Sequence, residues 1–274
     1  MGTLPSFYKR RRWTGKGYHA YPIPDSDKRD LPNLDQWLQF DAVVSEAKAG
    51  NFARIPHLAE WLVTSDDWVL QGEYSQLLGD AGSSSMLSQI LRQLPVGQDI
   101  ILEFVYAQLL ECWGHLSVIP ALIDMYERYS FSEDAMYVAQ SLSRLVESVP
   151  GELAAFPANG SVGEVRSYCE MASRQYRELC DRLGTEDAIV FRGEIVGVER
   201  IGQRILDDLS MRKTLHEEMR HKLEAYTGAD CSGFYENEAL RPLTVAAITE
   251  DVLNRSDVAQ LQEGVRYFFG HRLS

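Results

Sequence analysis

The sequence predicts an all-α protein in which helical hairpins stack side by side, followed by a helical C-terminal region. The first indication is a unit that repeats after 32 residues, since segment 74–82 returns at 106–114 with tyrosine, glutamine, two leucines and glycine at the same places. A repeat of this length is one helix–turn–helix hairpin, which is too small to bury its apolar face alone, so neighbouring hairpins must stack. The second indication is the apolar pattern, because the same shift superimposes three sets of residues: Ile55, Leu58 and Leu62, then Leu87, Ile90 and Leu94, then Ile119, Leu122 and Tyr126.

The first 33 residues differ from the rest in composition. They contain four prolines and a Gly-Lys-Gly segment, so we expect residues 1–33 to form an N-terminal arm rather than a helix. Aromatic side chains would let this arm pack across the helical body: Phe7, Tyr8, Trp13, Tyr18 and Tyr21.

A helix over 34–50 opens the second expected domain, the repeat array at 34–150. Thr64, Ser65 and Asp66 form an N-cap cluster inside the first hairpin, and glycines at 79, 82 and 114 end helices. The repetition is degraded in the third hairpin, where Tyr137 stands one residue out of step with Tyr106. The predicted hairpins pair helices 53–63 with 67–79, 84–94 with 98–112, and 116–129 with 132–148.

Prolines and glycines at 150–151 and 157–160 mark a boundary, so residues 151–274 are predicted to form a C-terminal helical region packed on the array. We expect helices at 162–183, 194–226, 243–254 and about 256–263 there. The apolar run 188–191 fits either a short strand or a buried connection. The aromatic ending at 265–272 is expected to be held against the body rather than frayed.

Charge is unevenly distributed along the chain, whose formal net charge is −13. Residues 1–29 carry seven basic and two acidic side chains, whereas residues 30–155 carry five basic and eighteen acidic ones. Such an acidic array repels nucleic acid and attracts basic proteins, although acidity also serves solubility alone. The basic stretch 9–13 could hold a phosphate with Trp13 stacked on a base, but the acidic body would oppose a polyanion. We therefore expect no nucleic-acid partner.

Several classes of protein are disfavoured. No run of 18 apolar residues indicates a membrane-spanning helix, and no apolar stretch follows the N-terminal basic residues as in a secretory signal. The four cysteines form no CxxC pair, which fits a reducing compartment, so a cytoplasmic location is expected.

The pattern contains no motif that indicates catalysis. His216 and His221 are five residues apart and so do not share a helix face as zinc ligands would. The glycines at 193 and 197 do not form a phosphate-binding loop. We therefore expect no catalytic residue, no cofactor and no metal site.

The array itself is the expected functional surface. If the second helix of each hairpin faces inward, acidic side chains gather along one side and form a groove for a basic protein. Trp68 and Trp113 could anchor a partner there, but a core position is expected for both. The candidate partner-binding residues are Asp66, Asp67, Glu73, Asp99, Glu103, Glu111, Glu133 and Asp134.

Residues 50–150 resemble HEAT-like repeats, an α-solenoid family, and the whole chain looks like the all-helical immunity proteins of bacterial polymorphic toxin systems. The segments that carry the resemblance are Ile55-Pro56-x-Leu58, Leu78-Gly79-Asp80-Ala81-Gly82, Tyr106-Ala107-Gln108-Leu109-Leu110 with Trp113-Gly114, Ile119-Pro120-x-Leu122 and the ending 266–272. The resemblance implies a bacterial protein that binds a cognate toxin domain and blocks it, without catalytic residues. Two alternatives stay open: a HEAT-like scaffold or adaptor without a toxin partner, and a small-molecule enzyme in which His216, His221 or a cysteine meets carboxylates in a pocket.

Overall fold

The protein is mostly helical, which confirms the predicted all-α class, and its few strands are two residues long. These strands form three antiparallel hairpins, β1 with β2, β3 with β4 and β5 with β6. The computed structural model describes residues 4–13, 17–93, 100–129, 135–147, 161–211, 215, 217–236 and 239–274.

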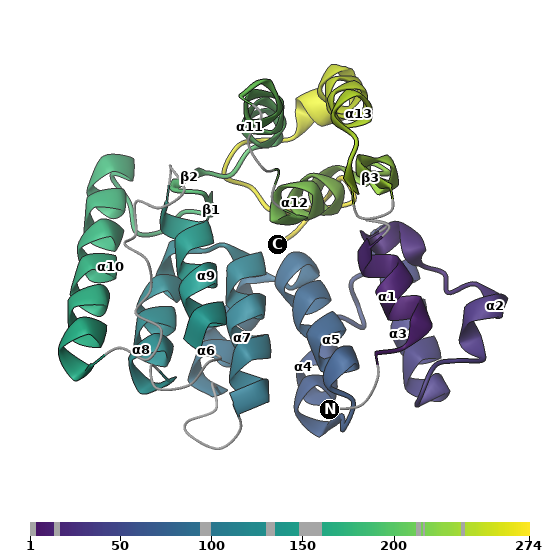
Figure 1. Ribbon diagram of the computed structural model, residues 1–274, viewed down its shortest axis with the longest axis horizontal. Helices are drawn as coiled ribbons and strands as arrows, with labels where there is room; N and C mark the ends of the chain where they lie inside the picture. The colour runs from purple at the N-terminus through teal and green to yellow at the C-terminus, as the bar shows by residue number, and fades with distance from the viewer. Residues whose placement is uncertain are drawn as a thin grey trace. The chain divides into compact units, whose positions relative to one another are not determined.

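The chain forms two compact units, and their boundaries differ from the expected division at residues 33 and 150 (Figure 1). Unit 1 combines the two ends of the chain, Met1–Ile55 and Gly197–Leu273. Unit 2 contains Pro56–Val196 together with Ser274. The N-terminal segment and helix 34–48 therefore belong with the last third of the chain and not with the repeat.

Unit 2 contains the predicted helices with small shifts at their ends, and the two helices of the first predicted hairpin, like those of the third, pack against each other. Helix α10 has the predicted bounds, because Ser161 forms a capping box with Glu164 and Gly184 ends the helix at φ 68°. The elements are α4 (His57–Thr64), α5 (Trp68–Ala81), α6 (Ser84–Gln93), α7 (Ile100–Trp113), a 3-10 turn (Leu116–Val118), α8 (Ile119–Tyr129), α9 (Ala135–Val146), α10 (Val162–Leu183), β1 (Val190–Phe191) and β2 (Glu194–Ile195).

The second helices of the hairpins, α5, α7 and α9, lie side by side and run in the same direction (Figure 1). The side chains that meet across this row are 33 residues apart, close to the repeat length. Between α5 and α7, Ser75 Oγ lies 3.5 Å from Gln108 Oε1. Between α7 and α9, the ring centroids of Phe104 and Tyr137 lie 4.3 Å apart, and Glu111 forms an ion pair with Arg144.

Gly79 sets the spacing between α5 and α7. A Cβ at this position would stand 2.6 Å from both the backbone oxygen of Leu109 and the Cβ of Cys112. Real Cβ atoms do not approach so closely, so the two helices can pack at this distance only where the residue is glycine.

The β1–β2 hairpin is fixed to the C-terminal ends of α7 and α9, which decides the open question at 188–191 in favour of a short strand. The amide of Val190 donates to the oxygen of Gly114 at 2.7 Å, and Leu116 donates to Ala188 at 2.9 Å. At the hairpin turn, the amides of residues 192 and 193 donate to the oxygens of residues 144 and 145, each at 2.8 Å. The amides of residues 190, 192 and 193 thus satisfy carbonyl groups that the ends of α7 and α9 leave unpaired.

Unit 1 departs further from the sequence-based expectations. Residues 1–33 are not an arm without helix, since they contain α1 and α2. The expected helix 194–226 is two helices, and in place of a helix at 256–263 there is a short 3-10 turn followed by a hairpin. The elements are α1 (Ser6–Trp13), a 3-10 turn (Gly17–Ala20), α2 (Asp25–Lys28), α3 (Leu34–Lys48), α11 (Val198–Ser210), α12 (Glu217–Thr227), 3-10 turns at Ser232–Phe234 and Val258–Gln260, β3 (Tyr235–Glu236), β4 (Ala239–Leu240), α13 (Pro242–Asn254), β5 (Tyr267–Phe268) and β6 (His271–Arg272).

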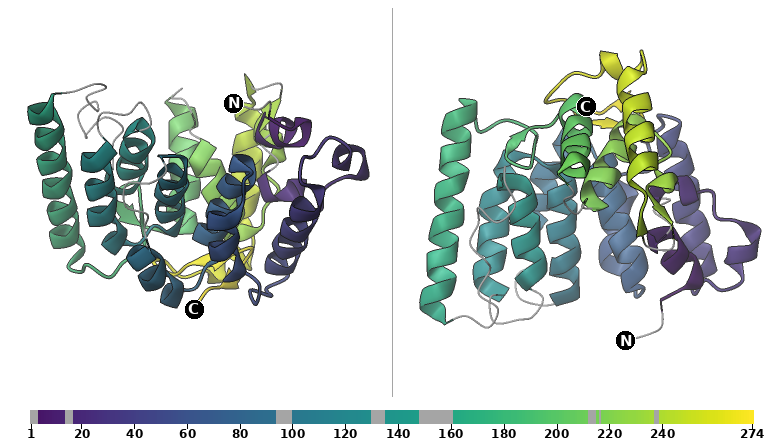
Figure 2. Two further views of the ribbon diagram at one scale, coloured as in Figure 1. Left: turned by 90° about the horizontal axis from the view of Figure 1, so that it is seen from below. Right: turned by 45° about the horizontal axis from the view of Figure 1, so that its top comes forward.

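Aromatic side chains form the core of unit 1 and join its two halves. Phe7 is buried against Tyr21 and Trp37, with ring centroids 5.8 and 5.9 Å apart. Tyr18 packs edge-on against Phe268 of β5 at 5.0 Å. The expected anchoring of the N-terminal aromatics is thus confirmed for these residues, and Figure 2 shows the purple N-terminal helices beside the green-to-yellow C-terminal ones.

Candidate interaction surface

The net negative charge of the chain comes entirely from unit 2. Residues 56–196 contain 21 aspartates and glutamates, eight arginines and no lysine, a balance of −13. The segments of unit 1, residues 1–55 and 197–273, contain 19 acidic and 19 basic residues and are neutral. Unit 2 is therefore the part of the protein whose electrostatic field would attract a cationic partner.

The predicted partner-binding carboxylates occupy different environments. Asp66 is exposed in the turn between α4 and α5, whereas Asp67, Glu73 and Glu111 are buried. Glu103 lies on α7, but its side chain is outside the described part of the structure. The remaining three residues lie outside the described residues altogether: Asp99, Glu133 and Asp134.

Asp67 is the N-cap of α5. Its Oδ1 accepts hydrogen bonds from the amides of Val69 at 3.0 Å and Leu70 at 3.3 Å, which satisfies two donors that the helix start leaves open. Its Oδ2 is buried and has no hydrogen-bond partner among the described residues. The negative charge of Asp67 adds to burial in raising the pKa of the Tyr74 hydroxyl.

Glu111 links α7 to α9. Its carboxylate accepts hydrogen bonds from Arg144 Nη1 at 3.0 and 3.1 Å and from Ser141 Oγ at 2.8 Å. Because Glu111 is 8% exposed, this charge is used inside unit 2 to hold two neighbouring helices together.

The exposed carboxylates of unit 2 lie mostly on elements that the sequence-based reasoning did not consider. The prediction placed them on the second helices of the hairpins, whereas the described ones lie mainly on α8, on α10 and in the segment that follows α10, and on α10 four exposed arginines balance the four exposed carboxylates. The exposed acidic residues are Glu60, Asp66, Asp124, Glu127, Glu164, Glu170, Glu178, Asp181, Glu186, Asp187 and Glu194, and the exposed arginines are Arg92, Arg128, Arg166, Arg174, Arg177 and Arg182.

Ser117, His115 and Asp187 form a hydrogen-bonded array, which invites comparison with a catalytic triad. Nδ1 of His115 lies 2.7 Å from Ser117 Oγ, and its Nε2 lies 2.9 Å from an oxygen of Asp187. However, the Ser117 amide also donates to Nδ1 at 3.1 Å, so this nitrogen caps the turn at 116–118 and is not free to take a proton from the serine. Asp187 is 94% exposed, so water competes for its contact with the imidazole. The array fastens the segment before β1 to the start of α8.

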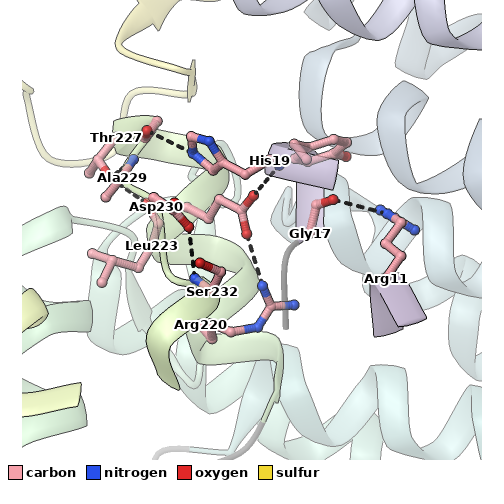
Figure 3. Close-up of polar contacts among 12 residues, drawn as sticks. Arg11, Gly17, His19, Arg220, Leu223, Thr227, Ala229, Asp230 and Ser232 are labelled. Atoms are coloured by element: carbon pink, nitrogen blue, oxygen red, sulfur yellow. Dashed lines mark hydrogen bonds and ion pairs between the residues drawn. The ribbon is translucent and has the colours of Figure 1, made fainter. Parts of the chain in front are cut away.

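Unit 1 contains a buried carboxylate, Glu224 on α12, which joins the N-terminal segment to this helix. It accepts hydrogen bonds from Arg220 Nη1 at 2.9 Å and from the His19 amide at 3.1 Å (Figure 3). Burial raises the pKa of Glu224, and the charges of Arg220, His221 and His19 oppose that shift. Gly17 lies directly against this carboxylate, at φ +50°.

Arg11 belongs to the basic stretch 9–13, for which phosphate binding was considered. It is 7% exposed, its Nε donates to the Gly17 oxygen at 3.0 Å (Figure 3), and its guanidinium lies 5.4 Å from the centre of the Tyr21 ring. Within the basic stretch 9–13, Arg11 therefore stabilises the packing of unit 1.

The four cysteines and His221 are buried. All four cysteines are buried free thiols, and burial raises the pKa of Cys169 to about 11 and also raises that of Cys231. Thiols of this kind are poorly ionised and weakly nucleophilic at neutral pH. His221 is buried with its ring 5.4 Å from that of Tyr18, and His216 lies outside the described residues.

Comparisons with protein-family models, with curated proteins and with solved structures gave no match. In the described parts of the chain, no helix has both the length and the apolar character needed to cross a lipid bilayer.

Proposed function

We propose that the protein is an immunity or inhibitor protein that binds and neutralises a cognate bacterial toxin domain through the acidic surface of unit 2. The observation that carries this proposal is the division of charge. Unit 2 has a balance of −13 while unit 1 is neutral, although the two are similar in length. A general need for solubility would favour a net charge on both units, whereas a binding surface for a basic partner requires a net negative charge on only one of them.

The helical architecture supports the same proposal. We propose that unit 2 is a HEAT-like α-solenoid, since α5, α7 and α9 meet through residue pairs with a constant separation of 33. In such an array each hairpin contacts its neighbours and the helices together present a broad surface to another macromolecule. Buried, reduced cysteines are consistent with the cytoplasmic location that this function requires.

A toxin that acts on nucleic acid would supply the basic face, because it must bind phosphates itself. The acidic unit would then occupy the face that the toxin uses for its substrate. Attraction between opposite charges raises the association rate at low ionic strength, so the association rate constant should fall as salt is added.

Co-expression with the toxin domain encoded by the adjacent gene tests the proposal. We expect protection of the host cell and a stable complex of the two purified proteins. Asp124→Lys with Glu170→Lys, on the exposed surface of α8 and α10, should slow association about tenfold or more at low salt. The matched control makes the same charge change in unit 1, Glu250→Lys with Asp251→Lys on α13, and should leave the rate within about twofold.

The test also separates the proposal from the alternative of a scaffold or adaptor. Absence of both binding and protection would overturn the inhibitor function. A scaffold would instead bind its partner without affecting the growth of cells that express a toxin.

A further inference from the structure

We propose that the turn between α4 and α5 is the anchor point of unit 2 for a cationic side chain of its partner. Trp68 would provide the aromatic face for a lysine or arginine, and Asp66 the carboxylate that pairs with it. This inference rests on the proposed function only in taking the partner to be a basic protein.

Together with Tyr137, which is 37% exposed, Trp68 is one of two exposed large aromatic residues among the described side chains. It is 42% exposed, whereas Trp37 and Trp113 are 0% and 1% exposed, so the expectation that Trp68 belongs to the core is wrong and that for Trp113 is confirmed. Val63, at the end of α4, is 52% exposed. Tryptophan is the residue type most enriched among side chains that dominate protein interfaces, where it buries a large area with little loss of conformational freedom.

The backbone around Trp68 is held in place by several hydrogen bonds. Within the turn, the Asp67 amide donates to Ser65 Oγ at 3.2 Å, and Gln71 Nε2 donates to the Ser65 oxygen at 2.9 Å. At its two ends, the Ser65 amide donates to the Trp61 oxygen at 3.0 Å and Asp67 caps α5. A turn that is ordered before binding loses little entropy when a partner docks.

Two carboxylates give the turn its negative charge. Asp66 is exposed, and in the described part of the chain no hydrogen bond or ion pair engages it. Asp67, the next residue, is 8% exposed, and its Oδ2 has no hydrogen-bond partner among the described residues. Trp68 and Asp66 are two residues apart and both exposed, a pairing that suits an arginine or lysine, because a cation over an aromatic ring can also pair with a nearby carboxylate.

The surroundings favour this occupant over an apolar one. An amphipathic helix would need a stripe of apolar side chains at helical spacing, whereas the exposed apolar residues of this turn are Val63 and Trp68 in the part of the chain that is described. The net charge of −13 on unit 2 repels anionic partners and attracts cationic ones.

The probe for the first test is tetra-arginine amide, titrated into the whole protein labelled with nitrogen-15. We expect the indole N–H resonance of Trp68, assigned by its loss in Trp68→Phe, to shift more than the other indole resonances, and no shift with tetra-glutamate. Asp66→Asn should reduce the shift at least threefold. Glu170→Gln removes the same charge elsewhere on unit 2 and should leave the shift unchanged. Equal shifts at all indoles, or equal effects of the two substitutions, would show diffuse attraction and overturn the anchor.

The second test uses the complex with the toxin domain. Trp68→Ala should weaken binding about tenfold or more, the loss typical of a central interface tryptophan, with circular dichroism and melting temperature close to the wild-type values. If the toxin binds wild type and Trp68→Ala equally well, the anchor is wrong and the proposed function stands. If tetra-arginine acts at Trp68 but no toxin is bound, the proposed function is wrong and the anchor stands.

Discussion

At the scale of single residues, the acidic side chains of unit 2 divide into those that build the fold and those that face water. Asp67 caps α5 and Glu111 holds α7 to α9, while Asp66, one position before Asp67, makes no such contact with the described residues. The sequence-based prediction placed the N-cap among residues 64–66, whereas the cap is the next residue, Asp67. The sequence also does not reveal that Trp68 is exposed, because exposure depends on which helices pack around it and not on the local pattern.

Substitution of the two neighbouring aspartates separates these roles. Asp67→Ala should lower the free energy of unfolding by about 1 kcal/mol, the usual cost of removing an N-cap, and Asp66→Ala should change it by less than about 0.5 kcal/mol. Urea denaturation followed by circular dichroism measures both. A larger loss for Asp66→Ala than for Asp67→Ala would contradict the assignment of the cap.

At the scale of elements, helix positions were predicted where strong end signals stand next to a periodic apolar pattern. Helix α10 has such signals in Ser161 and Gly184, and its bounds agree with the prediction. The prediction for the N-terminal segment was wrong because its prolines indicated an arm without helices. Pro5, however, immediately precedes α1, and its oxygen accepts the first helical hydrogen bond from Lys9 at 3.1 Å. Proline at a helix start is compatible with the helix that follows.

The two glycines of α5 provide a matched test of how closely α5 and α7 must pack. Gly79→Ala would place a Cβ 2.6 Å from the Leu109 oxygen, so we expect a loss of about 1–3 kcal/mol in the free energy of unfolding. Gly72→Ala meets no atom within 4 Å and should stabilise the protein by about 0.5–1 kcal/mol, because alanine favours the helix. Thermal unfolding of both variants gives the comparison, and a stabilising Gly79→Ala would mean that α5 and α7 can separate without cost.

At the scale of the whole molecule, the all-α class could be predicted, but the division into units could not. The repeat is a local pattern that recurs, so a single sequence displays it. Unit 1 depends on contacts between distant parts of the chain, such as the hydrogen bond from the His19 amide to Glu224. These two residues are 205 positions apart, and such a contact produces no periodic pattern in the sequence. The charge contrast between −13 and zero becomes visible only when the chain is divided after residue 55 and before residue 197.

Deletion of residues 1–33 tests whether this segment is an appendage or a part of unit 1. Because Phe7, Tyr18 and Tyr21 are each about 2% exposed or less, their removal should expose much of the core of unit 1 and lower its melting temperature by about 10 °C or more. The fragment 56–196, measured in parallel by circular dichroism, should retain helical structure. An unchanged melting temperature after the deletion would show that the segment is dispensable.

The joining of both chain ends in unit 1 has a consequence for synthesis on the ribosome. Residues 17–20 are made about 200–250 residues before α12 and Phe268, against which they pack. At about 5–20 residues per second, this segment waits roughly 10–50 s for its partners, while unit 2 has all but its last residue by position 196. Unit 2 can therefore fold during translation before the partners of residues 17–20 in unit 1 have been made.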